Sequence, residues 1–157
     1  MFRLGFEFTN FVPDMTGSGI AVSPDGSLIA FAAVDAGDSS LFLRQLGADE
    51  AKPLAGTVGA RFPFFSPDSL WIGFFADGLL KKIRLPDGAP QIICAAPGGS
   101  VDWGVDGFIR FGDTGDGALR GISRVSEDGG EPEVLTQLNR ERGETHHLAP
   151  QFLPATG

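Results

Sequence analysis

A short motif that recurs about every 40 residues constrains the fold of this chain most strongly. The triplet Ser-Pro-Asp occurs at residues 23–25 and again at 66–68, 43 positions later, each time between two apolar runs. A degraded third copy spans Val101–Phe111 and lies 38 positions on when Trp103 is matched to Phe65. Repeats near 40 residues that contain several short strands are typical of the blades of a β-propeller.

The residues of one repeat support this interpretation. Ser-Pro-Asp-Gly is typical of a turn, because Pro presets φ, Asp bonds to its own backbone and Gly accepts a positive φ. Two apolar runs around such a turn predict a β-hairpin. We expect three further strands after each first strand: Leu28–Ala33, Leu41–Leu46 and Pro53–Leu54; Leu70–Ala76, Leu79–Leu85 and Gln91–Cys94; Phe108–Gly112, Leu119–Val125 and Glu133–Thr136.

Helices are disfavoured by the same residues. The expected third strands alternate in polarity, as in Lys81–Leu85, and no apolar pattern of helical period continues past the next Gly or Pro. The 23 glycines and 11 prolines would interrupt long helices repeatedly. The chain therefore reads as one all-β domain.

The repeats divide this domain into blade 1 (15–57), blade 2 (58–96), blade 3 (97–137) and the start of a fourth blade (138–157). The fourth begins with Ala149–Pro154, which echoes the run Arg61–Phe65. Residues 1–14 precede the first repeat, and within them Phe2–Phe8 alternates cleanly. We therefore expect them to supply a closing strand, with one face formed by Phe2, Leu4, Phe6 and Phe8.

These residues resemble the PD40 type of WD40-like β-propeller repeat, found in the TolB-like propeller family. The resemblance rests on the Ser-Pro-Asp-Gly turn, the apolar residue before it and the strand Leu28–Phe31, and it covers roughly residues 15–157. It departs at Gly104–Gly107, which lacks Ser-Pro, and at Pro154–Gly157, which lacks Asp. The resemblance implies a propeller but no particular function.

The same type of repeat occurs in propellers that precede prolyl-oligopeptidase-type hydrolase domains and in sensor regions that follow bacterial Ser/Thr kinase domains. The extended pattern of this chain looks most like the latter. The resemblance implies relatives that are often extracytoplasmic, and propellers that usually close with six to eight blades.

Three blades leave two open faces, which we expect to be apolar. Burying about 1,000 Å² would stabilise an assembly by roughly 25 kcal/mol, against an association cost of about 4–15 kcal/mol. We therefore predict a homodimer that closes a six-bladed ring. The open faces of the single chain, which this dimer would bury, are expected to be lined by Phe31, Phe42, Trp71, Phe74, Phe75, Trp103 and Phe111. The alternative is a propeller fragment of a larger protein.

Composition excludes several classes of partner. The formal charge of −8 disfavours binding to nucleic acid or anionic lipid, whose phosphates require Lys and Arg. No segment approaches the ~20 continuous apolar residues of a membrane span, and Met1–Glu7 does not predict a signal peptide. The single cysteine, Cys94, excludes an intramolecular disulfide and a Cys-rich metal site, and it falls in an apolar run. The sequence leaves the compartment open.

Few residues point to chemistry. His146 and His147 lack the further ligands of a metal site, yet they precede the first strand of the fourth blade as Arg61 precedes that of blade 2. Such loops open onto the central channel, so Arg61, His146 and His147 are the candidates for ligand contact. We expect no metal and no cofactor.

An enzyme is not expected. No Gly-x-Ser-x-Gly motif occurs, and the loop Asp113–Gly117 lacks the alternation and closing Glu of a calcium loop. Lys81, Lys82 and Arg84 fit a solvated strand edge that discourages aggregation. The sequence thus favours a non-catalytic scaffold for a protein or peptide partner; the alternatives are the propeller of a larger sensor kinase or hydrolase, or, less favoured, a hydrolase itself.

Overall fold

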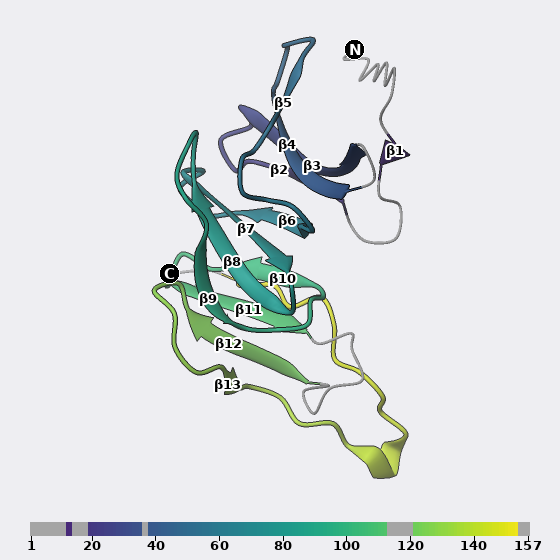
Figure 1. Cartoon of the computed structure of the whole chain (residues 1–157). Coiled ribbons are helices and arrows are strands. Elements are labelled where there is room, and N and C mark those ends of the chain that lie inside the picture. The colour runs from purple at the N-terminus through teal and green to yellow at the C-terminus, as the bar shows by residue number, and fades with distance from the viewer. Residues whose placement is uncertain (1–11, 14–18, 36–37, 113–120, 154–157) are drawn as a thin grey trace.

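The chain folds into three antiparallel β-sheets stacked face to face in chain order (Figure 1). The computed structural model describes residues 12–13, 19–35, 38–112 and 121–153. Within these ranges no α-helix occurs, and the one helical turn is the 3₁₀ turn η1 (Arg140–Arg142). The expected all-β fold with four-stranded antiparallel blades is therefore confirmed, and the sheet of blade 1 carries one additional short strand.

Each blade is one sheet. Blade 1 contains β1 (Val12–Pro13), β2 (Ile20–Val22), β3 (Leu28–Asp35), β4 (Asp38–Gln45) and β5 (Ala51–Pro53). Blade 2 contains β6 (Arg61–Phe65), β7 (Trp71–Ala76), β8 (Leu79–Arg84) and β9 (Gln91–Ala95), and blade 3 contains β10 (Val101–Trp103), β11 (Phe108–Gly112), β12 (Ile122–Ser126) and β13 (Glu133–Val134).

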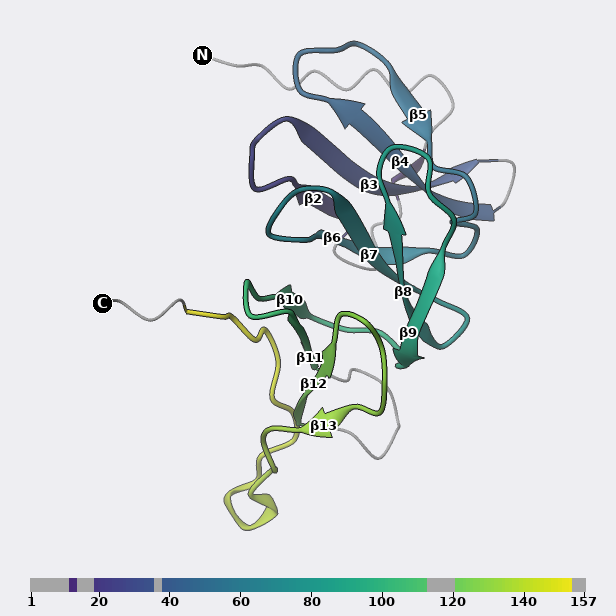
Figure 2. The same cartoon turned by 90° about the vertical axis from the view of Figure 1, so that its left-hand side faces the viewer.

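The first strands of the three blades, β2, β6 and β10, lie side by side and form the inner edge of the stack (Figure 2). In a propeller this edge lines the central channel. β1 pairs with β3 beside β2, through Val12–Val34 and Pro13–Ala33. The predicted closing strand of Phe2–Phe8 lies outside the described residues.

The Ser-Pro-Asp turn is closed by its own side chains. In blade 2 the Ser66 hydroxyl donates to the Asp68 carboxylate at 2.5 Å and accepts from the Trp71 N–H at 2.9 Å, while Asp68 accepts from the Leu70 N–H at 3.0 Å. Blade 1 repeats this arrangement at Ser23 and Asp25. The turn therefore fixes the register between the first and second strands of both blades.

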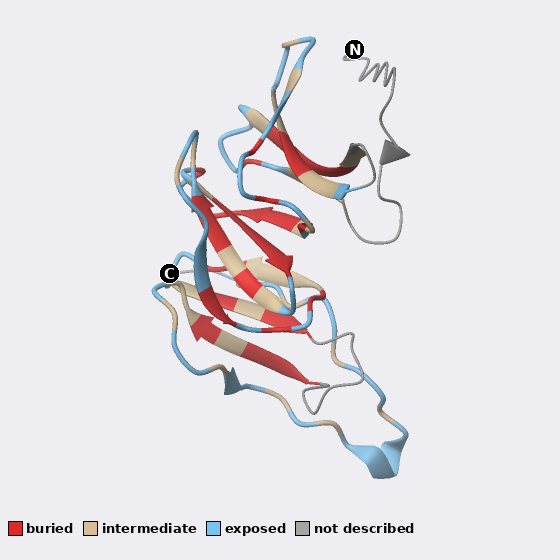
Figure 3. Cartoon of the chain, in the orientation of Figure 1, coloured by how far each residue is buried: buried red, intermediate tan, exposed pale blue. Residues whose placement is uncertain are grey.

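Two apolar layers hold the blades together, because successive residues of a strand point to opposite faces of a sheet. The layer between blades 1 and 2 contains Ala30, Ala32, Leu41, Leu54, Ala60, Phe65, Ile72, Phe74, Ala76 and Ile83. The layer between blades 2 and 3 contains Phe64, Phe75, Leu80, Ile93, Cys94, Ala96, Trp103, Ile109, Phe111 and Val125. Figure 3 shows this burial along the middle strands of each blade.

The expectation about the open faces was wrong for most of the residues named. Phe74 lies between blades 1 and 2, and Phe75, Trp103 and Phe111 lie between blades 2 and 3, so none of these four lines an open face. Polarity patterns show which residues share a face of a strand, but not which face meets a neighbouring blade.

The two outer faces differ in character. The outward face of blade 1 carries Ile20 and Val22 on β2, which are 62% and 59% exposed, beside a buried cluster of Ile29, Phe31, Ala33 and Phe42. The outward face of blade 3, opposite to the side that packs on blade 2, carries Phe108, Arg110, Gly112, Ile122, Arg124 and Ser126. Only the first of these faces is apolar as predicted, and Phe31 and Phe42 on it are themselves only 5% exposed.

Candidate functional site

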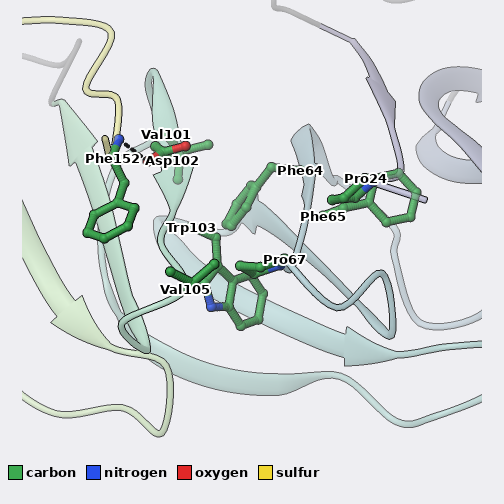
Figure 4. A pocket seen from close by; sticks show the side chains of 9 residues that line it. All are labelled: Pro24, Phe64, Phe65, Pro67, Val101, Asp102, Trp103, Val105 and Phe152. Atoms are coloured by element: carbon green, nitrogen blue, oxygen red, sulfur yellow. Dashed lines mark hydrogen bonds between the residues drawn. The ribbon is translucent and has the colours of Figure 1, made fainter. Parts of the chain in front are cut away.

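A groove of about 410 Å³ opens at the inner edge, where the first strands of blades 2 and 3 meet (Figure 4). Its lining comes from four parts of the chain: the first Ser-Pro-Asp turn, β6 with the second Ser-Pro-Asp turn, β10 with its following turn, and the segment after blade 3. The lining residues are Pro24, Phe64, Phe65, Pro67, Val101, Asp102, Trp103, Val105 and Phe152.

Trp103 forms the rigid centre of the groove. Its ring packs edge-to-face on Phe64, with centroids 5.9 Å apart, and its indole Nε1–H donates to the Glu127 carboxylate at 2.8 Å. Phe64 in turn packs on Phe75 at 6.3 Å. Because the indole is held on two sides, the groove presents a fixed aromatic wall.

Exposed apolar atoms surround this wall. Val105, in the turn after β10, is 72% exposed, and Pro24 is also exposed. A smaller hollow of about 240 Å³ shares Pro67, Trp103 and Val105 with the groove and extends towards Glu127. The two hollows adjoin at Trp103; the groove is mostly apolar, whereas the smaller hollow also carries Ser66, Asp68 and Glu127.

Asp102 is the acidic group of the groove lining, and its carboxylate accepts the backbone N–H of Phe152 at 2.5 Å. The ring of Phe152 lies over Arg110, with the guanidinium carbon 4.8 Å from the ring centroid. A second backbone contact, from the Ala149 N–H to the Ser100 hydroxyl at 2.7 Å, holds the same segment beside the start of β10. A piece of the chain's own backbone therefore already lies beside the groove, and Phe152 contributes to its lining.

Arg110 is itself held in place. Its guanidinium donates to both Asp106 oxygens, at 3.1 Å and 2.5 Å. These hydrogen bonds lower the pKa of Asp106 and raise the pKa of Arg110. The seat of Phe152 is thus formed by an ion pair whose geometry is fixed before any ligand arrives.

None of the three ligand-contact candidates from the sequence lines this groove. Arg61 begins β6 and is exposed, and in the part of the chain that the structure describes its side chain has no hydrogen bond or ion pair. His146 is exposed, and His147 is half-buried in the segment after blade 3. The role of these residues in ligand contact stays a prediction.

His147 belongs to a structural network. Its Nε2 lies 3.3 Å from the Glu144 carboxylate and its Nδ1 lies 2.8 Å from the Thr136 hydroxyl. A carboxylate only accepts, so in the neutral imidazole Nε2 donates to Glu144 and Nδ1 accepts from Thr136. Glu144 also accepts the Asn139 N–H at 2.6 Å, and this hydrogen bond, together with His147, lowers the pKa of Glu144.

Other chemistry finds little support among the described residues. Within ranges 12–13, 19–35, 38–112 and 121–153, no three His, Cys, Asp or Glu side chains gather as a metal site would require. Burial raises the pKa of the Cys94 thiol to about 11, which disfavours the reactive thiolate. No helix among the described residues is long and apolar enough to cross a membrane.

Nothing in the sequence pattern pointed to Trp103, Asp102 and Val105 as site residues. Trp103 is the counterpart of Phe65 in the repeat, and both residues end the first strand of a blade. That shared position is the one sequence signal that could have placed Trp103 at the inner edge. The contact between Asp102 and Phe152 joins residues 50 positions apart and has no local signal.

Solved structures share this fold. One assigned as TolB from Agrobacterium tumefaciens has a TM-score of 0.61 and 20% identity, over 74% of this chain and 47% of that one. The β-propeller domain of the Trilobed protease from Pyrococcus furiosus, which has an open velcro topology, has a TM-score of 0.55 and 17% identity, over 74% of this chain and 41% of that one. This chain thus spans less than half the length of either of these chains.

No family model matches the sequence, and no curated protein matches it. At these identities the likeness to solved structures shows a TolB-like β-propeller fold and leaves the function open.

Proposed function

We propose that this propeller is a non-catalytic interaction module that binds an extended segment of a partner protein in the groove beside Trp103. Copies of the chain assemble so that the ring of blades closes. The observation that carries the proposal is the contact between Asp102 and the Phe152 backbone, because in it a side chain of the groove binds a main-chain N–H of a segment distant in sequence.

The chemistry of the groove defines the partner segment. Asp102 offers an acceptor to a backbone N–H, and Trp103, Phe64 and Val105 offer apolar surface to a side chain. Extended segments that combine main-chain hydrogen bonds with one buried aromatic or aliphatic anchor fit such a surface. We place Arg61, His146 and His147 outside this contact, as secondary candidates at the channel mouth.

An alternative to self-assembly is that further sequence of the same protein supplies the remaining blades, as in a larger sensor kinase or hydrolase. The shares of 47% and 41% that this chain spans of the solved propellers favour this alternative. It leaves the groove unchanged, because the groove lies between blades 2 and 3.

Peptide binding tests the groove directly. The probe is a fluorescent peptide with the sequence of residues 148–157, and the receptor is the full chain with Phe152→Ala, which weakens the competing contact of its own segment. We expect saturable binding in fluorescence anisotropy, at least about tenfold weaker for the Phe→Ala peptide, because one buried aromatic anchor contributes 2 kcal/mol or more at such sites.

Val105→Asp in this receptor should weaken binding by a similar factor, because it places a charge on the apolar surface. Val58→Asp is the matched control, since Val58 is an exposed valine (63%) in the loop between β5 and β6. Arg61→Ala and His146→Ala test the secondary candidates in the same assay. Equal binding by the Val105 and Val58 variants, or no binding at all, would show that the groove is not the site.

A further inference from the structure

The outward face of blade 3 carries a cation held over an aromatic ring. The guanidinium carbon of Arg124 lies 4.6 Å from the ring centroid of Phe108. Glu133 fixes it there, because its carboxylate accepts from Arg124 Nε at 2.8 Å and lies 2.8 Å from Nη2. The remaining N–H groups of Arg124 have no acceptor in the described part of the chain.

The same arrangement occurs on the face of blade 2 that meets blade 3. Lys82 Nζ lies 4.7 Å from the ring of Trp71. The two pairs occupy equivalent positions in their blades. Each aromatic residue, Trp71 or Phe108, begins the second strand of its blade. Each cation lies on the third strand, opposite the residue two positions after the aromatic one: Lys82 opposite Gly73, and Arg124 opposite Arg110.

In blade 2 the cation at this position contacts the next blade. Lys82 is buried against blade 3, and its ammonium lies 3.9 Å from the carboxylate of Asp128 in the β12–β13 turn. A cation above a ring therefore receives the acidic turn of the next blade.

This turn packs on the preceding blade through its backbone as well. The Gly130 N–H approaches the carbonyl of Ile93 at 3.4 Å, and a Cβ at Gly129 would lie 3.1 Å from the same oxygen. In blade 2 the corresponding turn places Pro90 against Gly56 of blade 1. Docking of the third turn of a blade on its predecessor is thus a repeated feature.

Blade 1 has the same turn without a predecessor among the described residues. It runs between β4 and β5 and carries Asp49 and Glu50, both exposed and without a hydrogen bond or ion pair in the described ranges. Arg124, whose remaining N–H groups point to no acceptor in the described ranges, and the unpaired acidic turn of blade 1 are therefore complementary in charge and in repeat position.

We propose that a second copy of this chain docks its blade 1 on the outward face of blade 3, with Asp49 and Glu50 against Arg124. This inference rests on the self-assembly in the proposed function and names the residues that form the contact. At the inner edge, residues 147–152 of the same chain already lie over Gly112 and Arg110, and the exposed Leu153 (82%) after them offers apolar surface to Ile20 and Val22 of the partner. A two-fold pair makes this contact twice and closes the ring.

Charge reversal at each side, followed by mixing, tests the assignment. The variant Arg124→Glu places a carboxylate against Asp49 and Glu50 of the partner. The double variant Asp49→Lys/Glu50→Lys places ammonium groups against Arg124. Because each change brings like charges together, each variant alone should dimerise at least about tenfold more weakly than the unmodified chain. A mixed pair has complementary charge at both of its contacts. We therefore expect an equimolar mixture to regain dimers in sedimentation velocity.

Arg142→Glu and Asp87→Lys/Glu141→Lys are the matched controls, because these exposed residues undergo the same changes in charge away from the contact. Far-UV circular dichroism checks that each variant folds, and Arg124→Gln, which avoids repulsion from Glu133, should also weaken the dimer. If the unmodified chain dimerises but the reversed variants dimerise equally well, or their mixture regains nothing, this assignment fails while self-assembly stands. A monomeric unmodified chain would overturn both.

Discussion

At the scale of single residues, the Ser-Pro-Asp turns show how a short motif specifies a hairpin. Ser66 is buried, and its hydroxyl is the acceptor for the Trp71 N–H where β7 begins. Blade 3 lacks the serine, and there Asp106 accepts the Phe108 N–H at 3.3 Å and binds Arg110 instead. The aspartate is thus retained where the serine is not, and it changes partner.

Asp68→Asn should change the acid stability of the protein. The Ser66 hydroxyl and the Leu70 N–H donate to the carboxylate and lower the pKa of Asp68. A folded-state pKa below the unfolded value of about 3.9 adds stability above that value, and the contribution disappears as pH falls through the folded pKa.

We therefore expect the unmodified chain to lose more of its free energy of unfolding below about pH 4 than the Asn variant does. Urea unfolding at a series of pH values measures this difference. Asp87→Asn is the control, because Asp87 is an exposed aspartate with no hydrogen bond in the described part of the chain. Parallel acid profiles for the Asp68 variant and the unmodified chain would contradict the role given to the turn.

At the scale of elements, Gly73 on β7 makes room for the aromatic wall of the groove. A Cβ at this position would overlap the ring of Phe64, which packs on Trp103. The absence of a side chain at Gly73 therefore lets the ring of its cross-strand partner Phe64 lie over β7, in the layer between blades 2 and 3.

Gly73→Ala should destabilise the protein by about 1–3 kcal/mol, because the added methyl overpacks a close-packed layer. The near-UV circular dichroism of the Trp103 environment should change with it. In the double variant Gly73→Ala/Phe64→Ala the overlap disappears, so the loss should be smaller than the sum of the two single losses. Strictly additive losses in urea unfolding would show that the ring does not occupy this space.

The elements themselves could be predicted from the sequence, whereas their faces and the site could not. The turn residues and alternating strands predicted β7, β8 and β11 closely, since these signals are local. Phe74 and Phe75 both meet neighbouring blades because blade 2 is the middle one, and no local pattern reveals that position. The seat of Phe152 depends on Asp102 and Arg110, distant in sequence, and so emerged only with the packing.

At the scale of the whole molecule, the two ends of the stack are unlike each other. Blade 1 ends in exposed Ile20 and Val22 on its inner strand and in the acidic turn between β4 and β5, and blade 3 ends in Phe108 and Arg124. Unlike but complementary ends suit a head-to-tail contact, which either closes into a ring or continues as a filament. Closure by two copies is the arrangement that buries both ends with the fewest chains.

The mass of the unmodified chain in solution tests this account most directly. Sedimentation equilibrium over a range of protein concentrations should give a species of two chains that dissociates only on dilution, and raising the salt should shift the equilibrium towards single chains, because an ion pair contributes to the contact. A mass of one chain at every concentration, with both outer faces left in water, would contradict it.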